Sequence, residues 1–96
     1  MTEFEKSVYM EVKKIPKGAI ETYKSIAIKI GRPNAQRAVG NALHKNPDNK
    51  KIPCHRVISS RGECSANFAF GGKRAQELLL EKEGHKFKDG KYVEFL

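Results

Sequence analysis

Residues that end helices recur along this chain and limit the length of every element that it can form. Pro16 and Gly18, the run Gly31-Arg32-Pro33-Asn34, the pair Asn46-Pro47 and Gly84 interrupt the 96-residue sequence. Proline lacks the N–H that a helix interior needs, and glycine adopts the left-handed conformation that closes many helices. A chain of this length folds around a single hydrophobic core. The sequence therefore predicts one small domain, residues 1–96, made of short elements.

The first quarter of the chain carries two helix starts. Thr2 followed by Glu5 has the spacing of a capping box, and apolar residues then repeat at helical intervals, which predicts a helix over about 3–14. Thr22 is suited to cap a second helix that begins at Tyr23.

A third helix is expected after the turn at Gly31. The isoleucines between Tyr23 and Gly31 alternate as they would in a strand, but the glycine stop favours a short helix before the turn. Asn34 is then expected to cap a helix over about 35–44. Two short helices joined by a glycine-containing turn predict a helix-turn-helix over about 23–44.

The C-terminal part of the chain predicts one more helix and a hairpin. Gly71-Gly72 precedes a periodic apolar pattern, which predicts a helix over about 71–84 that ends at Gly84. The tail alternates about Asp89-Gly90, a turn pair typical of two-residue hairpins, which predicts a hairpin over about 86–96. The expected fold class is mainly α with a small β hairpin, in a winged helix-turn-helix-like single domain.

Basic residues are concentrated in one part of the chain. Nine of the 19 lysines and arginines lie between Thr22 and Gly62, where Asp48 is the one acidic residue, and the rest of the sequence is balanced in charge. This distribution indicates a polyanionic partner, for which nucleic acid is the natural candidate. The alternative is that the basic residues only keep a small protein in solution.

Composition also bears on location. No run approaches the about 20 apolar residues that a membrane span needs, and the start Met1-Thr2-Glu3-Phe4-Glu5 is too acidic for a signal peptide. Cys54 and Cys64 make no disulfide framework. We therefore expect a cytoplasmic protein with no membrane partner and with both thiols free.

Cys54 has the surroundings of a reactive thiol. It lies in a loop expected over about 46–58, between Pro53 and two residues that can be cationic, His55 and Arg56. Positive surroundings lower the pKa of a thiol, and the thiolate is the nucleophile. The alternative is a small buried apolar residue, which is the common role of a free cysteine. Cysteine and histidine ligands with paired spacing do not occur, so no metal site is expected.

Several sequence blocks, in a fixed order, resemble one known family. In chain order they are Thr22-Tyr23-Lys24-Ser25-Ile26-Ala27, Arg37-Ala38-Val39-Gly40, Asn46-Pro47, Pro53-Cys54-His55-Arg56-Val57, Gly71-Gly72 and Glu83-Gly84-His85. Together they extend over nearly the whole chain and resemble the acceptor domain of the O6-alkylguanine-DNA alkyltransferases, also called methylated-DNA-protein-cysteine methyltransferases. The resemblance implies DNA repair by direct reversal, in which the protein itself takes up the alkyl group.

The resemblance implies a chemical role for four residues. Cys54 would accept the alkyl group from guanine O6 in one irreversible displacement, without a cofactor. In this family a water held by the following histidine activates the thiol, and a glutamate polarises that histidine; the matching residues are His55 and Glu83. Tyr23 would donate a proton to the departing base and help to rotate the nucleotide, and its alternative role is that of a core aromatic residue.

The resemblance also implies a mode of DNA binding. The target atom lies inside the duplex, so the nucleotide must be flipped out. Arg37 matches the arginine that fills the gap, and its alternative roles are a phosphate contact or a solvated helix residue. Ala35, Ala38 and Ala42 share one helix face, which in this family approaches the minor groove; packing against the preceding helix is equally plausible. Arg56 is suited to a phosphate or a nearby carboxylate. The residues expected at the DNA are Arg37, Ala35, Ala38, Gly40, Asn41, Lys24 and Arg56.

The segment 59–70 matches the loop that lines the family's substrate pocket, with one departure. A tyrosine usually precedes the paired glycines, whereas the run here is Asn67-Phe68-Ala69-Phe70, in which Phe68 is the best match and lacks the hydroxyl. Asn46 is expected to brace the turn after the recognition helix, and Cys64 to have no catalytic role. The residues expected in the pocket are Pro53, Val57, Ser59, Ser60 and Phe68.

Three functions are considered from the sequence. The first is stoichiometric transfer of an alkyl group to Cys54 from O6-alkylguanine, with O4-alkylthymine as a further candidate, in double-stranded DNA bound by a monomer. The second is that of the alkyltransferase-like proteins, lesion binders of similar size that recruit other repair factors but typically carry another residue in place of the cysteine. The third is a winged-helix transcription regulator, which would prefer one DNA sequence over any alkylated base.

Overall fold

Four α-helices form most of the regular structure in the computed structural model, which describes residues 1–66 and 68–95. The elements are, in chain order, α1 (Glu3–Lys13), β1 (Glu21–Thr22), α2 (Tyr23–Lys29), α3 (Gln36–His44), the 3₁₀ turn η1 (Cys54–Arg56), β2 (Val57–Ile58), α4 (Gly72–Lys82), β3 (Phe87–Lys88), β4 (Lys91–Tyr92) and the 3₁₀ turn η2 (Val93–Phe95). The mainly α class with a small hairpin is confirmed. Among residues 1–66 and 68–95, no helix is both long enough and apolar enough for a membrane span.

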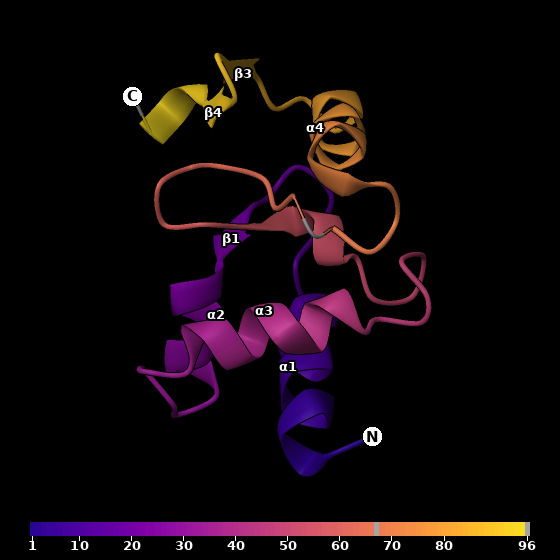
Figure 1. The fold of residues 1–96 in the computed structure, drawn as a ribbon, viewed down its shortest axis with the longest axis vertical. Coiled ribbons are helices and arrows are strands. Elements are labelled where there is room, and N and C mark those ends of the chain that lie inside the picture. The colour runs from indigo at the N-terminus through magenta and orange to yellow at the C-terminus, as the bar shows by residue number, and fades with distance from the viewer. Residues whose placement is uncertain (67, 96) are drawn as a thin grey trace.

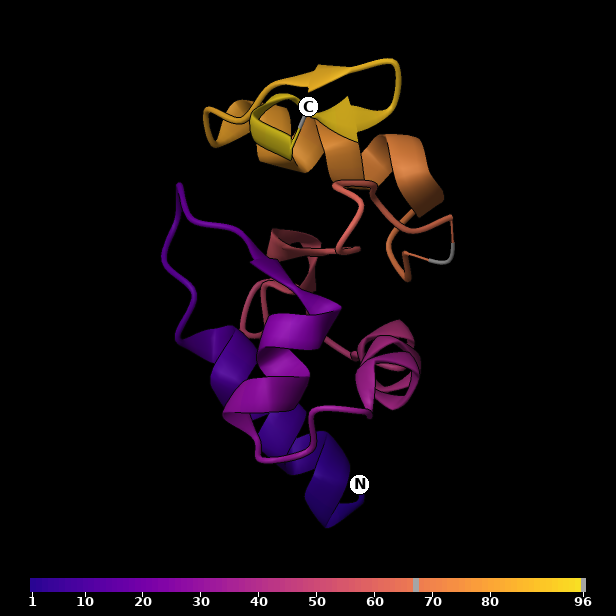
Figure 2. The ribbon, with the colours of Figure 1, turned by 90° about the vertical axis from the view of Figure 1, so that its left-hand side faces the viewer.

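The elements form two groups with the Cys54 segment between them (Figure 1). Helices α1, α2 and α3 pack on one another at the end of the molecule that holds the N-terminus. Helix α4 and the β3–β4 hairpin form the opposite end, and the view at right angles shows the same division (Figure 2). The segment that carries Cys54 is therefore bounded by helices from both groups.

Threonine caps set the starts of the first two helices. The Thr2 hydroxyl accepts a hydrogen bond from the backbone N–H of Glu5, and the Glu5 carboxylate accepts one from the N–H of Thr2. Thr22 and Ser25 form the same reciprocal pair at α2. Each cap satisfies N–H groups that have no partner within the helix. The predicted starts of α1 and α2 are therefore confirmed.

The predicted start of α3 is wrong by one residue. Its N-cap is Ala35 rather than Asn34, and no side chain caps this end. The backbone N–H of Ala35 donates to the carbonyl of Arg32 at 2.9 Å. Because this backbone turn carries the chain into the helix, the Asn34 side chain has no capping role.

A two-stranded parallel pairing was not predicted. β1 pairs with β2 in the register Glu21 to Val57 and Thr22 to Ile58. Each strand has only two residues, too few for a recognisable alternating pattern. The pairing places the start of α2, which carries Tyr23, beside β2.

The predicted hairpin forms but is shorter than expected. Phe87 pairs with Tyr92 across a two-residue turn at Asp89 and Gly90, whose φ angles are 52° and 81°. Positive φ at both positions is the requirement that Asp-Gly meets. The chain then enters η2 instead of extending the strand, and Leu96 lies outside the described residues.

The core has two parts that meet at β2. The main cluster includes Val8, Ile26 and Val39, one from each of the first three helices, together with Val57, and these four side chains are fully buried. The second cluster consists of Ile58, Cys64, Leu80 and Tyr92 and lies beneath the hairpin. Neighbouring residues of a strand point to opposite faces, so two consecutive β2 residues serve the two clusters.

Gln76 of α4 is a polar link between the two groups of elements. Its side chain is 1% exposed. The amide nitrogen donates to the carbonyls of His55 and Val57 at 3.0 and 2.8 Å, and the amide oxygen accepts from the backbone N–H of Ser65 at 2.9 Å. The Gln76 side chain thus connects α4 to the backbone of the cysteine turn and of the segment that follows it.

We expect replacement of Gln76 with leucine to lower the free energy of unfolding by about 1–3 kcal/mol, because it leaves buried backbone groups without partners. Urea denaturation followed by circular dichroism measures the change. The matched control is Leu78→Gln on the same helix, where the side chain is 45% exposed and a change within about 0.5 kcal/mol is expected. Equal stabilities of the two variants would show that these hydrogen bonds contribute nothing.

Candidate functional site

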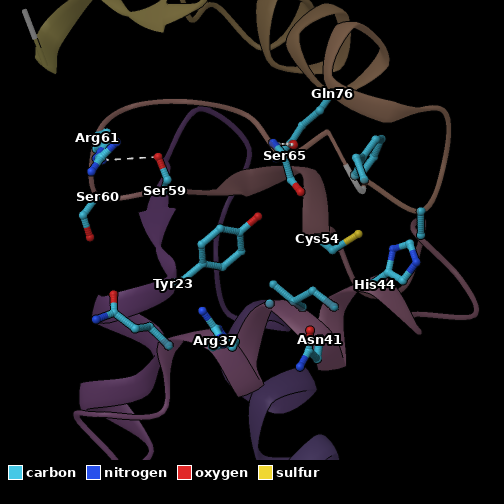
Figure 3. Close-up of a pocket in the computed structure, with 15 residues that line it drawn as sticks. Tyr23, Arg37, Asn41, His44, Cys54, Ser59, Ser60, Arg61, Ser65 and Gln76 are labelled. Carbon is cyan, nitrogen blue, oxygen red and sulfur yellow. Dashed lines mark hydrogen bonds between the residues drawn. The ribbon is translucent and has the colours of Figure 1, made fainter.

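Cys54 lies at a cavity of about 490 Å³ that opens between α3, α4 and the segment 59–69. In Figure 3 the Tyr23 hydroxyl points toward Ser65, and Cys54 lies among the residues that line the cavity. The lining residues that the sequence predicted are Tyr23, Arg37, Gly40, Asn41, Cys54, Ser59, Ser60 and Phe68. Those that it missed are Gln36, Leu43, His44, Arg61, Ser65, Ala69 and Gln76.

A tight turn at Pro53 sets the position of Cys54. Pro53 has φ −74° and ψ 67°, the inverse γ-turn conformation, and the N–H of Cys54 donates to the carbonyl of Ile52 at 2.7 Å. The buried amide of Asn46 donates to the same carbonyl at 2.7 Å and accepts from the N–H of Asp48 at 3.0 Å. Asn46 thus closes the loop between α3 and η1.

A continuous line of polar contacts leads from the thiol to α4. Cys54 Sγ donates to Asn49 Oδ1 at 3.1 Å, and Asn49 Nδ2 lies 3.1 Å from His55 Nδ1. His55 Nε2 lies 3.0 Å from Glu83 Oε2. The structure therefore brings Cys54, His55 and Glu83 together, with Asn49 between the first two. Asn49 was not predicted from the sequence, because nothing in a polar loop marks one asparagine as a contact of the thiol.

Glu83 is shared between His55 and Arg56. Arg56 Nε donates to Glu83 Oε1 at 3.0 Å, and Arg56 Nη2 donates to Oε2 at 2.8 Å. The third nitrogen, Nη1, donates to the carbonyl of Ile15 at 2.8 Å. Of the two partners considered from the sequence, phosphate and carboxylate, the carboxylate is the one that Arg56 contacts here. Its guanidinium ties the end of α1, the cysteine turn and α4 together.

Burial controls the protonation of the site. It raises the pKa of the Cys54 thiol, although hydrogen bonds from the Asn46 side chain and from the backbone N–H of Cys54 oppose it. This direction is opposite to the one expected from the basic neighbours. Burial also raises the pKa of Tyr23, with a hydrogen bond to Ser65 acting against it. Because the protonated thiol is favoured, a nearby base must remove its proton before it can attack.

The carboxylate end of the site is held ionised. Hydrogen bonds from Arg56, followed by those from His55, lower the pKa of Glu83 to about 2, although burial opposes this shift. An ionised Glu83 is an acceptor, so it favours a proton on Nε2 of His55. The Nε2 atom of His55 thus faces Glu83, and its Nδ1 atom faces the loop at Asn49.

The exposed face of α3 borders the cavity. Arg37, Ala38 and Asn41 are exposed, and Lys24 is exposed in the first turn of α2. A Cβ added at Gly40 would meet open space, so the helix presents little bulk there.

The three alanines at the N-cap of α3 and within it differ in burial. Ala42 is buried, and its carbonyl accepts from the hydroxyl of Tyr9 on α1 at 2.6 Å. Ala38 is exposed and Ala35 is half-buried. Ala42 is therefore the alanine that packs against α1, while Ala38 is left exposed.

Two of the five expected pocket residues lie elsewhere. Pro53 and Val57 are buried but do not line the cavity, since Val57 belongs to the main core cluster. Phe68 does line it and meets Phe70 edge to face, with ring centroids 5.7 Å apart. Asn67, in the same expected loop, lies outside the described residues. Residues 1–66 and 68–95 contain no group of three or more possible metal ligands.

Comparison with known sequences gives a consistent result. The model of the family described as 6-O-methylguanine DNA methyltransferase, DNA binding domain, matches residues 3–85. The methylated-DNA–protein-cysteine methyltransferase of Methanosarcina barkeri is 44% identical over 87 residues, which are 91% of this chain and 54% of the relative. The enzyme of the same name from Saccharolobus islandicus is 48% identical over 86 residues, 90% of this chain and 54% of the relative. The chain thus spans about half the length of these relatives.

Solved structures agree with the sequences. Schizosaccharomyces pombe Atl1, in complex with damaged DNA containing O6-carboxymethylguanine, has a TM-score of 0.83 at 38% identity over 96% of this chain and 88% of its own. The Mycobacterium tuberculosis O6-methylguanine methyltransferase has a TM-score of 0.78 at 40% identity over 86% of this chain and 49% of its own. Because the family model matches most of the chain and the fold agrees, this chain belongs to the 6-O-methylguanine DNA methyltransferase family and represents its DNA-binding domain.

Proposed function

We propose that this chain repairs DNA by taking an alkyl group from O6-alkylguanine onto Cys54, once per molecule. The observation that carries this proposal is the position of the Cys54 thiol, at a cavity and in line with the His55–Glu83 pair. A volume of about 490 Å³ suits a flipped purine base, since small-molecule pockets begin near 300 Å³. The activities of the methyltransferase relatives support the same reaction.

The reaction needs one bond to form and one to break. Sγ of Cys54 attacks the alkyl carbon while the bond from that carbon to guanine O6 breaks, which gives a thioether. The thiol proton passes to Nδ1 of His55, and Glu83 stabilises the imidazolium that forms. The departing guanine takes a proton from the Tyr23 hydroxyl, and the proton on His55 returns to Tyr23 through solvent. Because a thioether is not hydrolysed in neutral aqueous solution, Cys54 stays alkylated and each molecule acts once.

The proposed DNA-binding surface is the exposed side of α3 together with the start of α2. Arg37 and Asn41 border the cavity, so a nucleotide rotated out of a duplex bound at α3 has a short path to Cys54. We assign this helix to the minor groove and Arg37 to the gap left by the base. Lys24 and the backbone near Gly40 would contact the strands. Solved relatives crystallised with DNA, including the M. tuberculosis protein, support DNA as the partner of this chain.

The test is intact-protein mass spectrometry after incubation with a duplex that carries one O6-methylguanine, followed by peptide mapping. A gain of one methyl group on the peptide that holds Cys54 is expected. An unmodified duplex of the same sequence is the control. An unchanged mass after prolonged incubation with excess lesion would overturn the proposal.

A second candidate is a lesion binder that performs no transfer. It is favoured by the match to S. pombe Atl1, which extends over 88% of that chain. The two candidates differ in one measurable respect, because a binder would retain the lesion duplex in a gel-shift assay while its mass stays constant. The presence of Cys54 favours transfer.

Replacing Arg37 with alanine is expected to slow methyl transfer by at least about tenfold while lowering affinity for unmodified duplex much less. An exposed arginine contributes roughly one phosphate contact, so the salt dependence of binding should fall by about one counterion. Transfer rates under single-turnover conditions and binding across a salt series measure the two effects. The control is Lys13→Ala at the exposed end of α1, which removes the same charge away from the cavity. Equal fold losses in the transfer rate and in the affinity for unmodified duplex would show that Arg37 makes only a phosphate contact.

A further inference from the structure

Asn49 joins the two reacting groups of the proposed site. Its Oδ1 atom accepts the Cys54 Sγ–H at 3.1 Å, and its Nδ2 atom lies 3.1 Å from His55 Nδ1, while Oδ1 lies 3.5 Å from the same nitrogen. The shorter contact and the donor capacity of Nδ2 identify Asn49 as the donor to His55. One amide therefore engages both the thiol proton and the lone pair that would receive it.

The loop holds Asn49 in this position. Within the loop, the carboxylate of Asp48 accepts from the N–H of Lys50 at 2.9 Å, and the carbonyl of Asp48 accepts from the N–H of Ile52 at 2.9 Å. Asn46, which is buried, fixes the two ends of the same loop. Asn49 itself is half-buried, so its amide is supported by the loop yet has room to rotate.

The directions of the hydrogen bonds are consistent along the whole line. Ionised Glu83 accepts from Nε2–H of His55, and the contact with the donor Nδ2 of Asn49 requires a lone pair on Nδ1. The amide oxygen of Asn49 then accepts the thiol proton of Cys54. In this arrangement the thiol and the imidazole are both neutral, and neither has a free site for the other.

We propose that Asn49 is a positioning residue that holds Cys54 as a thiol and occupies Nδ1 of His55 until its amide rotates away. A side-chain amide has no basic lone pair on nitrogen, so it does not relay a proton from Sγ to Nδ1. Its rotation would let the proton reach His55 directly or through one water. The raised pKa of Cys54 agrees with a protonated resting thiol. This inference rests on the proposed role of Cys54 as the alkyl acceptor.

The test measures the thiol without DNA, so its result does not depend on whether the chain repairs lesions. The rate of S-alkylation of Cys54 by iodoacetamide is followed by peptide mapping across a pH series. In this reaction the S–C bond forms, iodide leaves, and the thiol proton passes to His55 or to solvent. Cys64 gives little background, because burial raises its pKa to about 12.

Asn49→Ala is expected to react about tenfold faster near neutral pH, with the midpoint of its pH profile lowered by about one unit. Asn49→Asp is expected to react more slowly than wild type, because it retains the acceptor and adds a negative charge beside the thiol. The matched control Lys50→Ala alters the same exposed loop without touching either group and should stay within about twofold of wild type.

Two results would overturn the proposal. One is an Asn49→Ala rate that equals or falls below that of wild type. The other is a rate that rises by the same factor at every pH with an unmoved midpoint, which would indicate a looser loop rather than a lost hydrogen bond. Among the described residues, the titratable and charged groups that face Cys54 or its cavity are shared by all variants. They are Tyr9 on α1, Tyr23 on α2, Arg37 and His44 on α3, His55, Arg61, and Glu83 paired with Arg56.

Discussion

Cys54→Ser is expected to accept no methyl group from an O6-methylguanine duplex, while it still binds that duplex with nearly the affinity of the unreacted wild type. A serine hydroxyl is ionised far less readily than a thiol, so His55 cannot generate a useful nucleophile from it. The substitution is close to isosteric and leaves the cavity, α3 and Tyr23 in place. Single-turnover mass spectrometry and a gel-shift assay measure transfer and binding on the same samples.

The matched control is Cys64→Ser, because Cys64 is also a buried free thiol. It belongs to the small cluster with Leu80 and Tyr92, does not line the cavity, and has a pKa raised by burial to about 12. We expect this variant to lose some stability but to transfer methyl groups as wild type does. Methyl uptake by Cys54→Ser, or its loss in Cys64→Ser alone, would mean that Cys54 is not the acceptor.

Local features of the fold could be predicted from the sequence. The caps at Thr2 and Thr22 and the turn at Asp89-Gly90 depend on residues within a few positions of one another, and all three form as expected. The start of α3 shows the limit of this reasoning. A backbone hydrogen bond from Ala35 to Arg32 leads into the helix, and the Asn34 side chain does not cap it. Sequence spacing cannot distinguish these two ways of starting a helix.

The site depended on contacts between distant segments, and prediction was weaker there. Motif blocks supplied Cys54, His55 and Glu83, which the structure brings into one line of contacts. Gln76 and Asn49 were missed, because an amide in a helix or a polar loop reveals nothing about its partners until the chain has folded. Of the two alternatives for Cys54, a thiol activated by basic neighbours and a buried residue, burial sets the direction of its pKa, and burial is not visible in a sequence.

Glu83→Ala is expected to lower the free energy of unfolding by about 3–5 kcal/mol, a large part of the total for a domain of this size, because it leaves a largely buried arginine without its counter-ion. The side chains of Arg56 and Glu83 are 16% and 11% exposed. The Arg56 guanidinium would keep only its bond to the carbonyl of Ile15. Thermal unfolding by circular dichroism should show a drop of about 4–8 °C for each kcal/mol lost.

Glu83→Gln is the matched variant, since it retains the shape and an acceptor oxygen but removes the charge. It should lose less stability than Glu83→Ala, while its methyl transfer should be strongly slowed because His55 loses the carboxylate that stabilises its protonated form. Equal melting temperatures for Glu83→Ala and wild type would show that the Arg56 pair contributes nothing to folding.

The charge of Glu83 also gives its contribution to stability a defined pH dependence. In the folded chain its pKa is lowered to about 2, first by Arg56 and then by His55, from an ordinary value of 4.5. As pH falls below 4.5 the unfolded chain takes up this proton before the folded chain does, which favours unfolding. The stability that wild type holds over Glu83→Gln should therefore be constant above that pH and shrink as pH approaches 2. Urea denaturation of both proteins across this range measures the difference, and parallel curves would mean that the Glu83 carboxylate is not held ionised by its partners.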